Sequence, residues 1–254
     1  MLFRSNHEID LLEIRLNVLD EYVDKFVITE GDITFSGKQK ESYYLNNKHK
    51  FSKWEDKIIH NQIKIPKFES PWDREIYSRN SVMNLNIFND EDLILTSDCD
   101  EIPNPEVLKY VNDWINDDNH FTFNQVAYHG YLNNLYSEKW FGTRAATYKY
   151  MKNTTVNNIR EATEDENKIT GSIITNAGWH FTYCGDANHI KEKIHSFCDR
   201  HFDTPEVLDE IENNLEKGKD VLNRNGINYR IVNIDDSFPK YIVDNQKKYS
   251  YLIK

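Results

Sequence analysis

The chain has 254 residues, a net charge of −11, 13% aromatic residues and three cysteines. This length suits one large α/β domain, and no apolar run approaches the roughly 18 residues of a membrane span. The diffuse negative charge disfavours nucleic-acid phosphates as partners, while three cysteines without metal-ligand spacing provide no disulfide framework. With no signal-peptide pattern in residues 1–20, we expect a cytoplasmic protein.

Apolar runs alternate with helical patterns over about the first 130 residues, which predicts βαβ units and a mostly parallel sheet. A possible capping box, Ser5–Glu8, precedes leucines at helical spacing, so residues 6–20 should form an amphipathic helix. Further elements are expected as strands at Asp24–Glu30 and Lys57–Ile65, and as a helix from Ser70 to about Phe88.

The next strand, Asp92–Ser97, runs into an acidic segment and is followed by a helix from Asn104 and a strand at Phe121–Tyr131. Beyond residue 131 the pattern is less regular, and the polar stretch Asn153–Asn167 predicts a surface loop. The remaining elements are expected as strands at 169–175 and 177–184, helices at 187–198 and 205–217, and a weakly patterned tail of about 30 residues.

The strongest local signal is the motif Asp98-Cys99-Asp100, which lies where an apolar strand ends and a helix is about to begin. Ligands of open α/β sheets bind outside the carboxyl ends of strands. Two carboxylates on one bend can turn toward a hard cation such as Mg²⁺ or Mn²⁺, which also accepts phosphate oxygens. A solvated acidic turn would have the same sequence, and the neighbouring strand and helix are what favour a site.

Four blocks in order along the chain resemble glycosyltransferase family 17, which includes the β-1,4-mannosyl-glycoprotein 4-β-N-acetylglucosaminyltransferases. They are His7–Arg15 with the strand and loop Phe26–Gly37, then Trp72–Asn80, Ser97–Pro103, and Ala177–Phe181 with Cys184, Lys193 and Ser196. The resemblance implies a single domain with a GT-A type fold. Residues 1–130 would be a Rossmann-like donor-binding half, 131–220 an acceptor-binding half and 221–254 a C-terminal tail.

The resemblance further implies a nucleotide-sugar donor, with UDP-N-acetylglucosamine as the family expectation, and a glycan or other hydroxyl acceptor. Asp98 and Asp100 correspond to a D-x-D motif, one carboxylate binding Mn²⁺ or Mg²⁺ and the other acting through water or on the donor ribose. His180, within Gly-Trp-His, is a third candidate ligand, although a lone histidine is often structural. Residues 131–170 lack a clear match, so an N-glycan acceptor is not supported.

The donor diphosphate needs local cations on an acidic protein, and Arg74, Arg79 and Lys193 are the candidates. Arg74 and Arg79 are five residues apart on a helix, so both cannot face one site, and we prefer Arg79 together with Asn80. Glu30 ends a strand near Asp98 and would contact the nucleoside or cap the following loop. Trp140 and Trp179 are sugar platforms or buried core residues.

Family 17 resemblance implies inversion at the anomeric carbon, which requires a general base on the acceptor hydroxyl. Glu101 and Asp186 are the two candidates. Three alternatives remain: a non-catalytic nucleotide-sugar or carbohydrate-binding protein, a transferase acting on another acceptor such as a hydroxylated base, and a metal-dependent phosphoester hydrolase. The hydrolase is disfavoured because such sites need more clustered ligands than Asp98, Asp100 and His180 supply.

Overall fold

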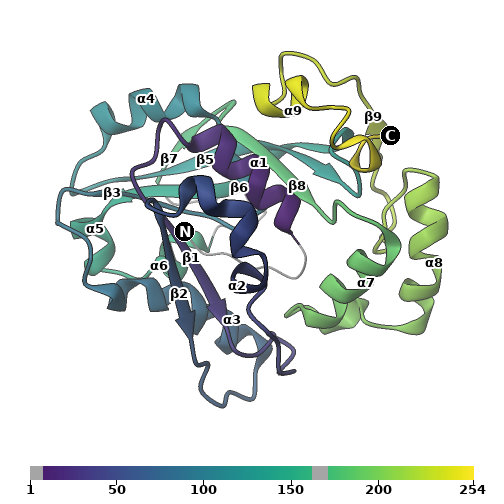
Figure 1. The fold of residues 1–254 in the computed structure, drawn as a ribbon, viewed down its shortest axis with the longest axis horizontal. Coiled ribbons are helices and arrows are strands. Elements are labelled where there is room, and N and C mark those ends of the chain that lie inside the picture. Colours follow the sequence, from purple (N-terminus) through teal and green to yellow (C-terminus); the bar gives the residue numbers. More distant parts are fainter. Residues whose placement is uncertain (1–7, 162–170) are drawn as a thin grey trace.

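The computed structural model describes residues 8–161 and 171–254, and it contains two sheets (Figure 1). β1 (Phe26–Gly31) and β2 (Ile58–Ile63) form a parallel pair. The larger sheet consists of β3 (Leu93–Thr96), β4 (Glu101–Pro103), β5 (His120–His129), β6 (Asn134–Thr147), β7 (Ser172–Ile174), β8 (Gly178–Thr182) and β9 (Arg230–Ile231). Its order is β3-β6-β5-β8-β4, with β7 beside β5 and β9 beside β6.

The predicted α/β class is confirmed, and the larger sheet is mixed where the sequence predicted a mostly parallel one. β5 pairs in parallel with β7 and β8, whereas β6 runs antiparallel to β3, β5 and β9, and β4 runs antiparallel to β8. The 14-residue β6 returns directly from β5 after a turn at Gly130, whose φ is +77°. Strands joined by so short a connection must be antiparallel.

Nine helices are present in the described part of the chain. They are α1 (Ile9–Leu19), α2 (Tyr43–Asn47), α3 (Pro71–Asn80), α4 (Pro105–Trp114), α5 (Tyr148–Lys152), α6 (Val156–Arg160), α7 (Ala187–Ser196), α8 (Pro205–Glu216) and α9 (Lys240–Asp244). Short 3₁₀ turns occupy η1 (Lys48–Trp54), η2 (Ser81–Leu85), η4 (Arg200–Phe202) and η5 (Ser250–Leu252). Figure 1 shows α7 and α8 at one end of the larger sheet and α5 and α6 toward the other.

Two local predictions need correction. The helix that begins at Pro71 ends at Asn80 and continues only as the 3₁₀ turn η2, because Asn86 then adopts a left-handed conformation with φ of 51°. The expected loop Asn153–Asn167 is wrong for Val156–Arg160, which form α6 with buried apolar contacts. The rest of that stretch from residue 162, and Ser5 of the capping box, lie outside the described residues.

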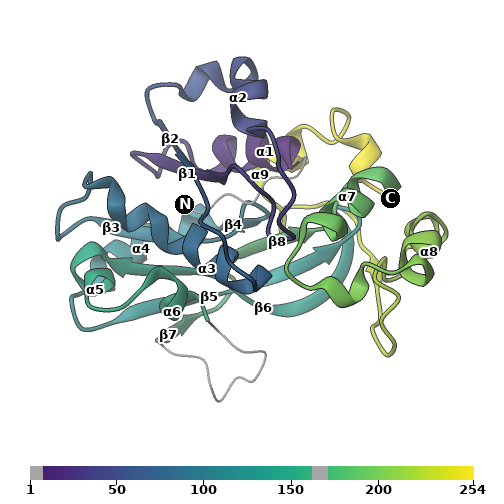
Figure 2. The same ribbon diagram turned by 90° about the horizontal axis from the view of Figure 1, so that it is seen from below.

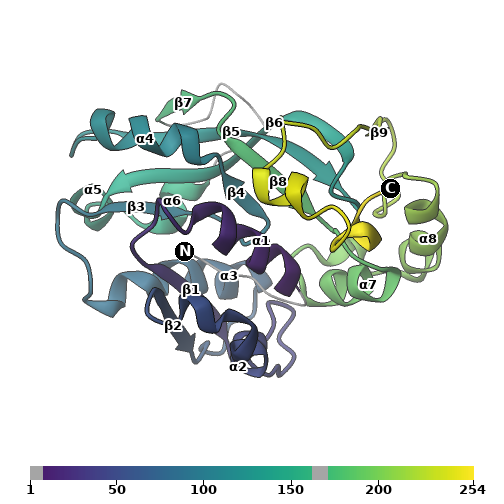
Figure 3. The ribbon, with the colours of Figure 1, turned by 45° about the horizontal axis from the view of Figure 1, so that its top comes forward.

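α1 lies between the two sheets and carries the centre of the core (Figures 2 and 3). Its apolar face, Leu11, Leu12, Ile14, Leu16 and Leu19, is almost fully buried, as the leucine spacing predicted. The C-terminal segment joins this core through α9, which contacts α1, and through the buried Ile242 and Leu252. None of the helices in residues 8–161 and 171–254 is both long enough and apolar enough to cross a membrane.

Candidate functional site

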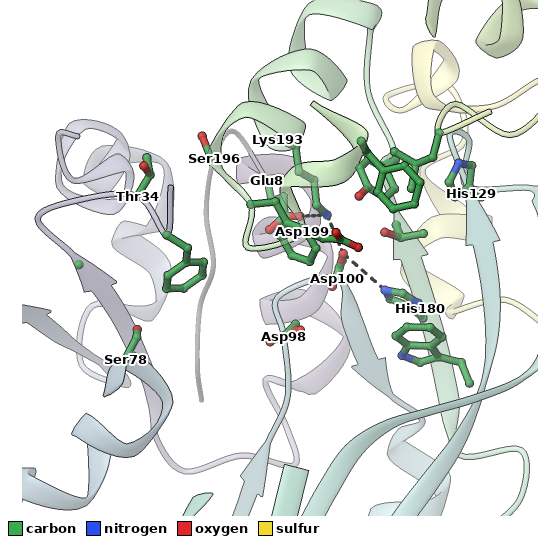
Figure 4. Close-up of a pocket in the computed structure, with 18 of the residues that line it drawn as sticks. Glu8, Thr34, Ser78, Asp98, Asp100, His129, His180, Lys193, Ser196 and Asp199 are labelled. Atoms are coloured by element: carbon green, nitrogen blue, oxygen red, sulfur yellow. Dashed lines mark hydrogen bonds and ion pairs between the residues drawn. The ribbon is translucent and has the colours of Figure 1, made fainter. Parts of the chain in front are cut away.

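A cavity opens between the loop after β1, the Asp98–Asp100 loop, the end of β8 and helix α7 (Figure 4). Its volume is about 250 Å³. The polar and charged residues that line it are Glu8, Thr29, Thr34, Lys40, Ser78, Asp98, Asp100, His129, His180, Thr182, Lys193, Ser196, Asp199 and Arg224. Lys40, Lys193 and Arg224 supply local positive charge on a chain whose net charge is −11.

The Asp98–Asp100 loop is held rigidly from beneath. Cys99 is fully buried in the core at the turn between β3 and β4, and the carboxylates on either side of it line the cavity wall. Arg15, only 1% exposed on α1, donates to the Asp98 carbonyl at 3.2 Å, to the Glu101 carbonyl and to the Ser97 hydroxyl at 2.6 Å. Burial lowers the pKa of Arg15 to about 10, so the guanidinium stays charged at neutral pH.

Asp100 lies at the centre of the cavity, between a cation and an imidazole. Its Oδ2 is 2.9 Å from Lys193 Nζ and 3.6 Å from His180 Nε2, and Lys193 also contacts Glu8 at 2.6 Å. Burial opposes the charge on Asp100, but Lys193 and His180 outweigh it and hold the pKa of this carboxyl well below its usual value. Burial raises the pKa of the Glu8 carboxyl to about 7 despite Lys193. Asp100 is therefore the carboxylate that carries the charge.

Asp98 faces a different partner. Its Oδ2 is 3.4 Å from Arg160 Nη2 and 3.9 Å from Arg79 Nη2. Arg160 also forms an ion pair with the fully buried Glu101, whose other oxygen accepts the Asp98 amide at 3.0 Å. Burial disfavours the charge on Arg160, yet Glu101 and Asp98 raise its pKa above the ordinary value. Glu101 thus fixes the shape of the loop and neutralises a buried cation.

Trp140 contacts both the residues around Asp100, through His180, and the residues around Asp98, through Glu101. Its ring stacks on His180 with centroids 4.2 Å apart and an interplanar angle of 22°, and its Nε1 donates to Glu101 at 2.9 Å. His180 Nδ1 is buried and has no hydrogen-bond partner among the described residues. A buried polar atom without a partner is costly, so its retention here favours a functional role for His180.

The cavity has two chemically different ends (Figure 4). One end follows the carboxyl end of β1 and offers hydroxyl groups beside the apolar side chains of Ile33 and Phe35; it is formed by Thr29, Gly31, Ile33, Thr34, Phe35 and Ser78. The other end is aromatic: Arg224 lies over the Tyr136 ring at 5.4 Å, and His129 packs against Tyr136 and Tyr183.

Arg224 is fixed by a buried carboxylate behind it. Asp220 Oδ2 accepts from Arg224 Nε at 2.7 Å, and Asp220 Oδ1 lies 3.1 Å from His129 Nε2. Burial lowers the pKa of His129, which favours its neutral form. The positive charge of Arg224 is thus balanced within the wall, and this end of the cavity presents stacked rings and an oriented guanidinium.

The structure brings five of the candidate residues from the sequence to the cavity: Asp98, Asp100, Trp140, His180 and Lys193. It does not bring Glu30 there, because this buried carboxylate accepts from Ser42, from the amides of Tyr43 and Tyr44, and contacts His60 at 2.9 Å. Glu30 therefore caps α2, the second of the two roles considered for it.

The remaining candidates also lie outside the cavity lining. Arg74 donates to the carbonyls of Phe35 and Phe68, and Asn80 accepts the amide of Asn157. Arg79 is paired with Glu75 and lies behind Asp98. Asp186 is an exposed N-cap that accepts the His189 amide at 2.8 Å. Trp179 donates to the Ser237 carbonyl, leaving Trp140 as the tryptophan that lines the cavity.

Several cavity residues were not singled out by sequence reasoning. Glu8 lies in the first family block, as does the buried Arg15 behind the cavity wall, whereas Lys40, Asp199 and Arg224 lie in no motif. Arg160 falls in the stretch that was expected to be a surface loop. The run Val156–Ile159, with two apolar residues three apart, is the signal that could have indicated a buried helix there.

The donor set was tested for a divalent cation. Asp100 Oδ2 and His180 Nε2 are 3.6 Å apart, close to the roughly 3.0–3.5 Å between two ligands of one ion at about 2.1 Å each. Asp98 does not join them, and no group of three or more candidate ligand side chains occurs within the described ranges. The residues present fit a divalent cation held by one carboxylate and one imidazole and completed by substrate oxygens; the imidazole favours a transition-metal ion such as Mn²⁺ over Mg²⁺.

Comparison with known proteins gave one family match. The model of glycosyltransferase family 17 matches residues 1–254. No curated protein matches the chain.

Proposed function

We propose, from the premise that this chain belongs to glycosyltransferase family 17 and is a glycosyltransferase, that its cavity binds a nucleotide sugar and moves the sugar to a hydroxyl acceptor. The observation that carries the proposal is the Asp100 carboxylate, which meets Lys193 and His180 midway between two unlike ends of one cavity. The Lys193 ammonium can stabilise the negative charge of a leaving diphosphate. Asp100 and His180 can do so indirectly, by holding a divalent cation.

The donor nucleoside is assigned to the end beside β1, where Thr34 and Ser78 offer hydroxyl groups and backbone lies close to the cavity. Lys193 then reaches the diphosphate from α7, and Lys40 adds a second cation on the same wall. Asp98, held by Arg160, faces the donor ribose. The expected donor is UDP-linked, with N-acetylglucosamine as the sugar.

Asp100 and His180 would hold the divalent cation, Mn²⁺ or Mg²⁺. When bound, such an ion offsets the charge that develops on the departing diphosphate. Lys193 stays protonated, since Asp100 and Glu8 raise its pKa well above the ordinary value against the effect of burial. Lys193 therefore stabilises the leaving diphosphate directly, and Asp100 does so through the cation that it would hold.

The acceptor is assigned to the aromatic end. Tyr136 and Tyr183 offer ring faces, and Trp140 borders the centre of the cavity. Rings of this kind pack against the apolar faces of pyranoses, while the Arg224 guanidinium donates to hydroxyl oxygens. A glycan or another uncharged hydroxyl compound fits this end. We further propose a single displacement with inversion.

The test is nucleotide release from a panel of nucleotide sugars, with and without Mn²⁺ and simple glycoside acceptors. We expect release from a UDP-sugar, slow in the absence of acceptor, and a loss of at least tenfold in Asp100→Asn. Asp113→Asn, an exposed position on α4, serves as the matched control and should behave as wild type. Absence of both turnover and thermal stabilisation with every donor would refute the proposal.

A further inference from the structure

An inverting transfer needs a carboxylate or imidazole that can take a proton from the acceptor hydroxyl. Four carboxylates line the cavity: Glu8, Asp98, Asp100 and Asp199. Glu8 and Asp100 are both bound to Lys193, and Asp98 faces Arg160. Lys193 and Arg160 stabilise the ionised forms of Asp100 and Asp98, which makes both of them poor bases. Burial raises the pKa of Glu8 to about 7 despite Lys193, but its side chain is only 4% exposed and leaves little surface for an acceptor hydroxyl. Asp199 is the one that differs.

Asp199 lies in the connection between α7 and η4, and Figure 4 shows its carboxylate pointing into the cavity. Oδ1 accepts from His201 Nδ1, and Oδ2 makes no hydrogen bond or ion pair with any described residue. The side chain keeps 30% of its accessible surface. One oxygen is therefore oriented by a partner while the other is available to a ligand.

The residues on either side of Asp199 anchor it. Cys198 is buried and its Sγ lies 2.6 Å from Glu75 Oε2, while Arg200 pairs with Asp203. Asp203 also accepts from His195 at 2.7 Å, which ties this connection to the last turn of α7. The segment that carries the carboxylate is thus anchored to α3 through Cys198 and to α7, the helix that supplies Lys193, through Asp203.

Asp199 also lies toward the acceptor side of the centre. Burial raises the pKa of Tyr183, at the aromatic end; Asp100 and Asp199 are near enough to raise it further, whereas Lys193 and Arg224 act against the increase. The Asp199 carboxylate therefore lies within electrostatic range of Tyr183, and His201 contacts it directly. A carboxylate with one available oxygen thus lies near an acceptor ring, in the cavity that also contains Lys193.

We propose that Asp199 is the general base of the transfer, an inference that rests on the proposed function. Asp199 Oδ2 accepts the proton of the acceptor hydroxyl as that oxygen forms its bond to the anomeric carbon. The bond from the anomeric carbon to the diphosphate breaks at the same time, and its electron pair leaves with the nucleoside diphosphate. Asp199 afterwards releases the proton to water.

The decisive experiment compares wild type, Asp199→Asn and Asp203→Asn in donor binding and in transfer from the UDP-sugar. For Asp199→Asn we expect donor affinity within about twofold of wild type and a transfer rate about 10²–10⁴-fold lower. The wild-type rate should fall at acid pH as the base becomes protonated, whereas the residual rate of Asp199→Asn should lack that acid limb. Asp203→Asn removes the anchor of the segment without touching the cavity, and should keep the wild-type pH profile.

A second variant separates the base from a structural role. Azide needs no deprotonation, so Asp199→Ala should form a glycosyl azide, detectable by mass spectrometry, at a rate close to that of wild type with azide. Undiminished transfer in Asp199→Asn, or equal losses of donor binding and transfer in Asp199→Asn and Asp203→Asn, would overturn the assignment. If wild type itself releases no nucleotide from any donor, the proposed function fails and the base with it.

Discussion

Lys193 Nζ lies 2.9 Å from Oδ2 of Asp100, the same oxygen that faces His180 Nε2 at 3.6 Å. A cation from α7 therefore already occupies one side of the carboxylate that the sequence analysis assigned to a divalent ion. Since like charges repel, Lys193 and a metal ion must share this oxygen at a cost. The diphosphate, which carries negative charge, is what can relieve that cost by contacting both.

Replacing Lys193 with methionine should separate these effects. Without the ammonium, Mn²⁺ alone should bind at least about tenfold more tightly, whereas UDP should bind at least about tenfold more weakly, each about 1.4 kcal/mol. Titration of Mn²⁺ by electron paramagnetic resonance and of UDP by calorimetry would measure both. Lys191→Met, on the same helix but outside the cavity lining, is the matched control. Unchanged Mn²⁺ affinity in Lys193→Met would argue against competition for Asp100.

Glu101 is the subject of a second prediction, because its buried carboxylate is paired with Arg160 and does not line the cavity. Glu101→Gln would leave Arg160 buried with less negative charge around it, which should lower the free energy of unfolding by about 3–5 kcal/mol. Urea denaturation would measure the change. Glu106→Gln, which breaks an exposed pair with Lys109, should leave the free energy of unfolding close to that of wild type. A stable Glu101→Gln protein that had lost at least a hundredfold in turnover would return Glu101 to the list of bases.

The sequence predicted those site residues that lie in a recognisable motif on or next to a strand. Asp98 and Asp100 stand at a strand exit, and their place on the cavity wall follows from that position and from the burial of Cys99 between them. His180 was accessible to sequence reasoning for the same reason, since it lies in a motif on an apolar strand.

The remaining cavity residues depend on contacts that no local pattern records. Arg160 reaches Glu101 across 59 positions of sequence, and Lys193 reaches Glu8 across 185. β6 escaped prediction because its two faces both become buried toward its end, which removes the alternation that identifies a strand. Glu30 was a candidate for the site because it ends a strand, but it lies outside the cavity. A carboxylate at the end of a strand can equally well cap the next helix, as Glu30 does here.

Tyr136 provides a test of the acceptor assignment. Tyr136→Ala removes the ring under Arg224, so the KM for a glycoside acceptor should rise about tenfold while the donor Kd stays unchanged. Initial-rate kinetics with varied acceptor at saturating donor would measure the first value, and calorimetry the second. Tyr110→Ala, an exposed aromatic on α4, is the control. A weaker donor affinity with an unaltered acceptor KM would place the two ends of the cavity the other way round.

His129 should make the stability of the fold depend on pH. Because burial lowers its pKa, the unfolded chain takes up a proton below pH ~6.5 that the folded chain binds less readily. The contribution of neutral His129 is therefore complete above pH ~6.5 and declines as the pH falls toward the folded pKa.

Asp220 has a depressed pKa, chiefly because His129 and Arg224 outweigh the effect of its burial, so its own contribution is lost only below pH ~4. Between about pH 6.5 and 4.5 the imidazole should thus lower the stability as the pH falls, while Glu8, whose pKa burial raises to about 7, acts in the opposite direction in both proteins compared here. In His129→Phe, Arg224 still balances Asp220, and urea unfolding across this range should show a shallower loss of stability than in wild type. Equal slopes in the two proteins would mean that the folded His129 binds its proton as readily as the unfolded chain does, and that Asp220 rather than burial governs its charge.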